Sequence, residues 1–270
     1  MHPYPRKGWG CNPHPNLRRI ISPVNIQPEK QTSFRIRLLG SRDTGMERYD
    51  PILDRVVLLK PGGVLDVGCG CGSYTVRLSP YCRRITAIDS SASLIERCKS
   101  ENARPNITYV CMDARNIAYP DASYDLVLER ACLHHILEWE KVLDEMIRLS
   151  SRYILMEEPI HDPRSEAKRN TIKAQQLFLE AQNEIGYTHY PYIKPASLTA
   201  YFKRRNMKVE TEIIKSDEPV DFEQFFISFG DLAGKSSRKE YWLDRLNQLK
   251  QELNGKMLCE EDIVFISVKK

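Results

Sequence analysis

The sequence predicts an α/β fold in which a mostly parallel sheet carries helices on both faces. From residue 61 onward, short apolar runs alternate with segments of helical periodicity, which is typical of strands joined by crossover helices. With 270 residues, 41% of them hydrophobic, the chain is long enough to bury a full core of this kind. No apolar run approaches the ~18 residues of a membrane span, so we expect no membrane contact.

The first predicted element is a strand followed by a glycine-rich turn, in the segment VLDVGCGCG at residues 64–72. Glycines at every second position let the backbone turn sharply and approach a ligand, because no Cβ stands in the way. A helical pattern starts near Ser73, so its free N–H groups would face that ligand. The segment therefore predicts a cofactor-binding strand–turn–helix unit. The third glycine of a dinucleotide fingerprint would fall at Ser73, and no phosphate-binding lysine follows.

Three further apolar runs end in polar residues at about the same point of the repeating pattern. The second strand ends in Asp89, 23 residues after Asp66, where a carboxylate can accept hydrogen bonds from ribose hydroxyls. Ser90 is expected to cap the next helix. The third run leads to Asp113 and Ala114, and the fourth is followed by the segment ERACLHHI at residues 129–136.

These four motifs, in this order over about residues 61–158, resemble the class I S-adenosylmethionine-dependent methyltransferases, in particular the small-molecule branch similar to methyltransferase type 11. The resemblance implies a Rossmann-like sheet of seven strands whose last strand is antiparallel, with S-adenosylmethionine as cofactor. In that family an acid at the position of Asp113 binds the adenine amino group. The cofactor-binding candidates are Asp66, Gly68, Cys69, Gly70, Gly72, Asp89, Ser90, Asp113, Ala114, Glu129 and, in the segment before the first strand, Tyr49.

Several of these residues also have a purely structural interpretation. Asp89 and Asp113 are of a type common in turns, Asp66 could orient the glycine turn, and a surface role for Tyr49 is equally compatible. Glu129 either touches the methionine portion of the cofactor or pairs with Arg130.

The catalytic candidates are His134, His135 and Glu129. Histidine titrates near neutral pH, which suits a general base. The competing interpretation is that the two histidines pack a helix or build the wall of the site.

The chain divides into an N-terminal part and a methyltransferase domain. Residues 1–60 form an extension and a helix, with Asp50 as its N-cap, expected to cover the cofactor site; residues 61–270 form the domain itself. Two insertions, at about 160–192 and 217–255, are rich in aromatic residues. We expect them to form a helical lid over the ligand crevice. Alternatively, Phe225 and Phe226 are the lid's own core.

The resemblance implies methyl transfer to an O, N or C atom of a small-molecule acceptor, mainly by in-line positioning. The segment ERAC after the fourth strand lacks the NPPY-like motif of enzymes that methylate adenine or glutamine. Two alternatives remain: an RNA-modifying methyltransferase, for which no basic face or RNA-binding module is evident, and a non-catalytic module that binds the cofactor. A dehydrogenase fits less well because the third fingerprint glycine is missing. Because no basic face or RNA-binding module is evident, we expect no nucleic-acid partner.

The cysteines and the N-terminus bear on metal binding and location. The eight cysteines show no zinc-ribbon or zinc-finger spacing, so we expect no metal. We interpret them as reduced thiols. The first residues lack the apolar stretch of a signal peptide, and we expect a cytoplasmic location.

Overall fold

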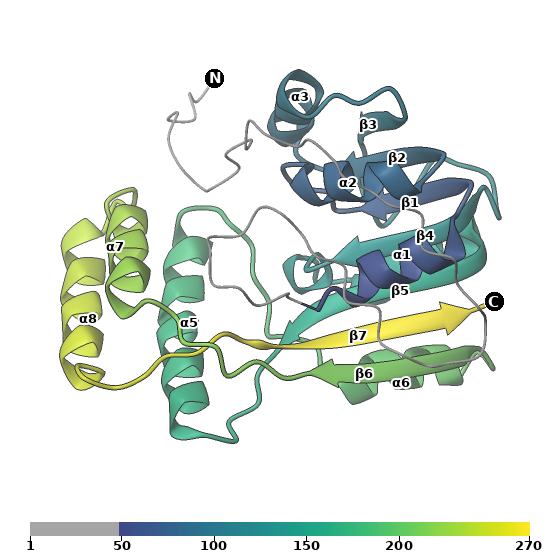
Figure 1. Ribbon diagram of the computed structural model, residues 1–270. Coiled ribbons are helices and arrows are strands. Elements are labelled where there is room, and N and C mark those ends of the chain that lie inside the picture. Colours follow the sequence, from purple (N-terminus) through teal and green to yellow (C-terminus); the bar gives the residue numbers. More distant parts are fainter. Residues whose placement is uncertain (1–48) are drawn as a thin grey trace, which may run out of the picture.

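The computed structural model describes residues 49–270, and its centre is a seven-stranded sheet of order β3-β2-β1-β4-β5-β7-β6 (Figure 1). Strand β7 is antiparallel to both of its neighbours, and the remaining pairs are parallel. This arrangement confirms the predicted mostly parallel sheet with an antiparallel last strand. The strands are β1 (Gly63–Val67), β2 (Arg84–Asp89), β3 (Ile107–Cys111), β4 (Tyr124–Arg130), β5 (Ser150–Ile160), β6 (Lys208–Ile214) and β7 (Asp262–Lys269).

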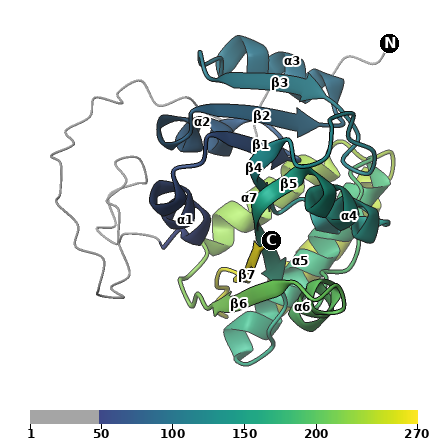
Figure 2. The same ribbon diagram turned by 90° about the vertical axis from the view of Figure 1, so that its right-hand side faces the viewer.

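Helices cover both faces of the sheet (Figure 2). Along β1, Val64 packs into the core under the helices of one face, whereas Leu65 and Val67 pack into the core on the other. A strand buried on both sides is expected where crossover helices flank a parallel sheet. One face carries α1 (Pro51–Leu59), α2 (Ser73–Leu78) and α3 (Ala92–Glu101), and the other carries α4 (Trp139–Leu149) and α6 (Pro195–Lys203). Two short 3₁₀ helices, η1 (Ser79–Tyr81) and η2 (Leu133–His135), follow α2 and β4.

Two helix starts test the predicted caps. Asp50 Oδ1 accepts a hydrogen bond from Leu53 N at 2.9 Å, so the predicted cap of α1 is confirmed. The prediction that Ser90 caps α3 was wrong by one residue, because Ser91 Oγ accepts from Leu94 N at 3.3 Å. The carboxylate of Asp89 binds Ser91 N at 2.9 Å. This bond forms a turn that places Ser91, and not Ser90, at the N-cap of α3.

The two insertions form a three-helix unit beyond one end of the sheet, made of α5 (Glu166–Glu184), α7 (Phe222–Ala233) and α8 (Lys239–Glu252) (Figure 1). Phe226 and Phe229 are buried in a core that these helices share, and Phe225 packs against it. The aromatic residues of the second insertion thus serve the unit's own core, which was one of the two interpretations of the sequence. Among residues 49–270, no helix combines the length and apolar character needed to cross a membrane.

A buried ion-pair network joins the three-helix unit to the sheet. Asp262, at the start of β7, is 1% exposed and accepts a hydrogen bond from Lys168 Nζ of α5 at 2.6 Å. Arg164 also donates to the Asp262 carboxylate, and Ser216 N donates to it at 3.1 Å. Because both the carboxylate and the Lys168 ammonium are removed from water, each depends on the other for compensation.

Candidate active site

The glycine turn after β1 folds toward the neighbouring strand β2. Gly68 N and Cys69 N both donate to the carbonyl of Ile88, at 2.8 and 2.9 Å. Gly68 has a φ of +72°, a conformation that side chains with a Cβ adopt only at a cost. An added Cβ at this position would also lie 2.1 Å from Cys132 Sγ, in the segment after β4. The turn is therefore held between the ends of two strands, and its tight fit requires glycine.

Asp89 connects this turn to the start of α3. Its Oδ2 accepts from Gly70 N at 2.9 Å and its Oδ1 accepts from Ser91 N at 2.9 Å. Each carboxylate oxygen can accept more than one hydrogen bond, so both oxygens keep acceptor capacity for a ligand. The side chain is only half-buried. The structure thus brings two of the cofactor candidates, Asp89 and Gly70, together.

Asp66 lies on β1, before the glycine turn, and its side chain contacts α2. It is 3% exposed and its Oδ2 accepts from Thr75 Oγ1 of α2 at 2.5 Å. Burial raises the pKa of Asp66 to about 6, against the opposing effect of the Thr75 hydrogen bond. The contact with Thr75 gives Asp66 a structural role at the start of α2, not the predicted contact with the glycine turn itself.

Glu129 is fully buried at the end of β4, next to a second acid. Its Oε2 accepts from Cys132 N at 3.2 Å, whereas Oε1 has no donor among the described residues. Burial and the nearby charge of Glu158 hold the pKa of Glu129 well above its ordinary value. Arg130 pairs with Glu157 at 2.8 Å. The alternative that Glu129 pairs with Arg130 is therefore wrong.

The remaining cofactor candidates are spread over different environments. Asp113 is exposed and paired with Arg115 at 2.7 Å, and hydrogen bonds from that arginine lower the pKa of Asp113. Ala114 is buried and Ser90 is exposed. Tyr49 donates to Glu212 on β6 at 3.2 Å. Since four strand-to-strand steps separate β6 from β1, this contact does not bring Tyr49 to the glycine turn.

His134 and His135 follow β4 in η2, and both are hydrogen-bonded through Nδ1. His134 Nδ1 lies 2.8 Å from Glu158 Oε2, and His135 Nδ1 lies 2.7 Å from the carbonyl of Thr188. Burial, followed by the charge of His134, lowers the pKa of His135. The neutral form of His135 therefore predominates near neutral pH.

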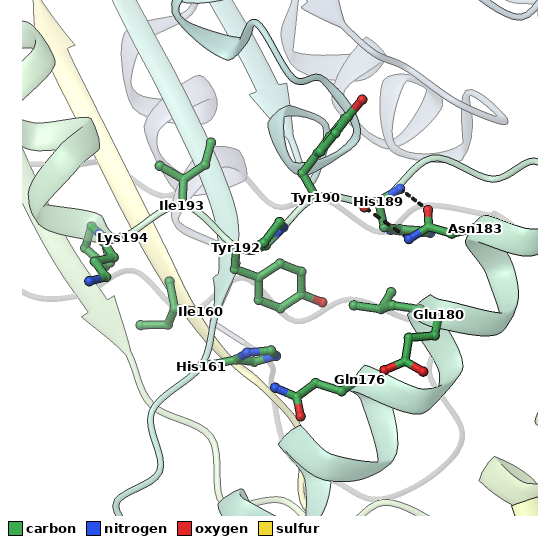
Figure 3. A pocket seen from close by; sticks show the side chains of 13 residues that line it. Ile160, His161, Gln176, Glu180, Asn183, His189, Tyr190, Tyr192, Ile193 and Lys194 are labelled. Atoms are coloured by element: carbon green, nitrogen blue, oxygen red, sulfur yellow. Dashed lines mark hydrogen bonds between the residues drawn. The ribbon is translucent and has the colours of Figure 1, made fainter. Parts of the chain in front are cut away.

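A cavity of about 640 Å³ lies between the end of β5, α5 and the chain at 189–195. Its lining includes His189, whose ring lies next to those of His134 and His135. Tyr190 N, in its lining, donates to the carbonyl of His134 at 2.8 Å. Figure 3 shows Tyr192 and His161 side by side in the cavity, facing Gln176 and Glu180 of α5. The lining comes from residues 160–195, so the first insertion contributes to it and the second does not.

Comparison with known proteins finds a matching family for the part of the chain that carries the glycine turn, Asp89 and Glu129. Residues 65–152 match the family described as "Methyltransferase domain". This segment is a methyltransferase domain. It includes every cofactor candidate except Tyr49. The family and the fold imply S-adenosylmethionine as the cofactor.

Curated relatives match about a third of the chain. An uncharacterised methyltransferase of Mycobacterium tuberculosis is 35% identical over 98 residues, covering 36% of this chain and 50% of the relative. Norajmaline N-methyltransferase of Rauvolfia serpentina is 31% identical over 97 residues, covering 34% and 33%. The chain thus spans half or less of the length of these relatives.

Solved structures extend the likeness to the fold outside this segment. The YcgJ protein of Bacillus subtilis has a TM-score of 0.59 at 15% identity, covering 81% of this chain and 97% of that one. The [4+2]-cyclase SpnF has a TM-score of 0.51 at 16% identity, covering 81% and 78%. At this identity the comparison shows the fold alone.

The residues of the methyltransferase domain fit the implied cofactor. The space around Gly70 is open, because an added Cβ would meet no heavy atom within 4 Å. Asp89 offers acceptor capacity beside that space, as ribose hydroxyls require. The Oε1 atom of Glu129 is buried without a donor among the described residues, so an ammonium group would satisfy it.

Sequence reasoning missed several residues that shape the site. Glu158 contacts both η2 and Glu129, and its position directly after the β5 apolar core was the only available signal. Cys132 fixes how closely the turn approaches β4. His189 joins the two histidines of η2 from a segment 54 residues away in sequence, and the sequence gives no sign of that contact.

Proposed function

We propose that this protein transfers the methyl group of S-adenosylmethionine to an oxygen, nitrogen or carbon atom of a small molecule bound in the cavity beside η2. The observation that carries the proposal is the carboxylate of Asp89, hydrogen-bonded to the glycine turn and to α3. The bound cofactor would supply an already activated methyl group. The protein then has to bind, align and shield the reacting atoms.

The cavity supports a small-molecule acceptor. Its volume of about 640 Å³ lies within the usual range for small-molecule sites, about 300–1,000 Å³. Its lining combines rings and aliphatic groups with a few polar side chains, which suits a planar or largely apolar acceptor. The alkaloid N-methyltransferase among the relatives acts, by its name, on a small molecule. These features favour a small molecule over RNA.

His135 is the proposed proton acceptor where the nucleophile of the acceptor carries a proton. Its Nδ1 lies against the carbonyl of Thr188, so Nδ1 carries the hydrogen and Nε2 keeps its lone pair. The low pKa of His135 keeps that lone pair available. As the nucleophile takes the methyl group, its proton passes to Nε2 and then to solvent. Glu158 orients the ring of His134 through the contact of its carboxylate with His134 Nδ1.

Substitution of Asp89 by alanine tests the cofactor site. We expect Asp89→Ala to weaken binding of S-adenosylmethionine and S-adenosylhomocysteine by about 1–3 kcal/mol, the cost of leaving polar partners unpaired, measured by calorimetric titration. Asp125→Ala is the matched control. Asp125 also accepts from two backbone N–H groups, Gly62 and Gly63, both at 2.9 Å, but at the opposite end of β1. Its loss should leave cofactor affinity unchanged.

The outcomes separate the alternatives. Equal cofactor affinity in folded Asp89→Ala and Asp125→Ala proteins would refute the ribose assignment. Binding of NAD in place of S-adenosylmethionine would refute the family's cofactor for this chain. Tight cofactor binding without turnover, in a screen of small acceptors with a labelled methyl group, would favour a binding module. Salt-dependent binding of bulk tRNA would favour RNA modification.

A further inference from the structure

Three histidines from two distant segments meet beside the cavity. One ring nitrogen from each of His134, His135 and His189 lies within 4.8 Å of the corresponding nitrogens of the other two. The ring centroids of His135 and His189 are 4.3 Å apart, and those of His134 and His135 are 4.2 Å apart. From this geometry we propose that the three histidines bind a divalent transition-metal ion, with zinc as the expected occupant. The proposal goes beyond methyl transfer, because it requires neither cofactor nor acceptor.

The hydrogen bonds of η2 leave the correct nitrogens available. A metal takes the lone pair of a neutral imidazole, and the other ring nitrogen then usually donates to a carboxylate or a backbone carbonyl. His134 Nδ1 faces Glu158 Oε2 at 2.8 Å, and His135 Nδ1 faces the carbonyl of Thr188 at 2.7 Å. Both arrangements leave Nε2 as the nitrogen with a lone pair. A metal ion bound at His135 Nε2 would occupy the lone pair that accepts a proton in the proposed methyl transfer, so the two roles of His135 exclude each other at any one time.

His189 completes the set with a nitrogen that lacks a protein partner. Its Nδ1 is buried and has no hydrogen bond among the described residues. A buried polar atom without a partner is costly, and a metal ion bound at this nitrogen would satisfy it. His134 and His135 thus each have a partner at Nδ1, whereas His189 Nδ1 has none among the described residues.

The segment that carries His189 is fixed at several points. Asn183 of α5 accepts from His189 N at 2.7 Å and donates to its carbonyl at 3.2 Å, as Figure 3 shows. Tyr190 N donates to the carbonyl of His134 at 2.8 Å. The backbone positions of the three rings are therefore held before any metal binds, which favours binding.

Three imidazole ligands indicate the class of metal and its environment. Zinc binds three protein ligands and leaves a fourth position open in its catalytic sites, with Zn–N bonds of about 2.0–2.1 Å. Those bonds place ligand nitrogens roughly 3.3 Å apart in a tetrahedron, so side-chain rotations must bring these nitrogens somewhat closer. His189 also lines the cavity. The open position would thus be supplied by water or by an oxygen or nitrogen of a molecule in the cavity.

Metal titration of the purified full chain tests the proposal. After removal of bound metal with a chelator, Co²⁺ is added as a spectroscopic probe and Zn²⁺ is then added in competition. We expect wild type to give the intense visible bands of a tetrahedral cobalt centre, which Zn²⁺ abolishes. His189→Gln and His135→Gln should each weaken Zn²⁺ binding by more than ~100-fold. Glu158→Gln should weaken it by about 10–100-fold, as expected for a residue that positions a ligand.

His161→Gln is the matched control, because His161 lines the same cavity and belongs to no such cluster within residues 49–270. Its Zn²⁺ affinity should equal that of wild type. No Co²⁺ or Zn²⁺ binding by wild type, or equal affinity in wild type and His189→Gln, overturns the proposal. Calorimetric titration with S-adenosylhomocysteine is run on the same samples. Cofactor binding retained while metal binding fails would refute only the metal site, and the reverse result would refute only the proposed methyl transfer.

Discussion

Substitution of Gly68 separates the two reasons why the cofactor turn requires glycine. Gly68 and Gly70 both have positive φ values, +72° and +54°, so alanine at either position costs about 1–2 kcal/mol of backbone strain. Only at Gly68 does the new Cβ also collide with another residue, at 2.1 Å from Cys132 Sγ and 2.8 Å from its Cβ. Overpacking of this kind adds about 1–3 kcal/mol. We therefore expect losses of about 2–5 kcal/mol for Gly68→Ala and about 1–2 kcal/mol for Gly70→Ala.

The assay is equilibrium urea denaturation of both variants without cofactor, so that ligand binding does not contribute to stability. The double variant Gly68→Ala/Cys132→Gly supplies the second comparison. Because it removes both side-chain atoms with which the new Cβ collides, part of the extra loss should be recovered as a coupling energy. The reasoning is refuted if Gly68→Ala is no more destabilising than Gly70→Ala, or if the double variant shows no coupling.

Two further predictions concern buried carboxylates. Asp262→Asn should lower the free energy of unfolding by about 3–5 kcal/mol, because it leaves Lys168 buried beside a neutral side chain. The control Glu252→Gln, at the exposed pair with Lys173, should lower it by less than about 1 kcal/mol. Similar losses for both variants in urea denaturation would contradict the prediction that the buried pair matters more. Glu129→Gln should stabilise the protein more at pH 8 than at pH 5, because the folded-state pKa of Glu129 is raised above the ordinary 4.5. The wild-type protein therefore loses up to about 1.4 kcal/mol of folding stability per pH unit as the pH rises from the unfolded-state pKa toward the folded-state pKa. A stability difference between the two proteins that does not change with pH would show that Glu129 ionises without cost.

Much of the sheet and of the cofactor turn could be predicted because their signals are local. Each strand is a short apolar run followed by a polar residue, and the run fixes both burial and the edge at which that residue emerges. Asp89 and Gly70 meet because parallel neighbouring strands end together. The cap of α3 was misplaced because two serines adjoin, and only the contact of Asp89 with Ser91 N decides between them.

The acceptor side of the site was less predictable because its contacts join segments that the sheet does not align. The partner of Arg130 is Glu157, across the β4–β5 pair, and not its sequence neighbour Glu129. His189 reaches His135 only because Asn183 and Tyr190 hold the chain at the end of α5 against η2. The cysteine spacing, from which no metal was expected, carries no information about such a cluster. Imidazoles brought together by tertiary contacts leave no spacing signature, so a three-histidine site of this kind becomes visible only once the first insertion is placed beside β4.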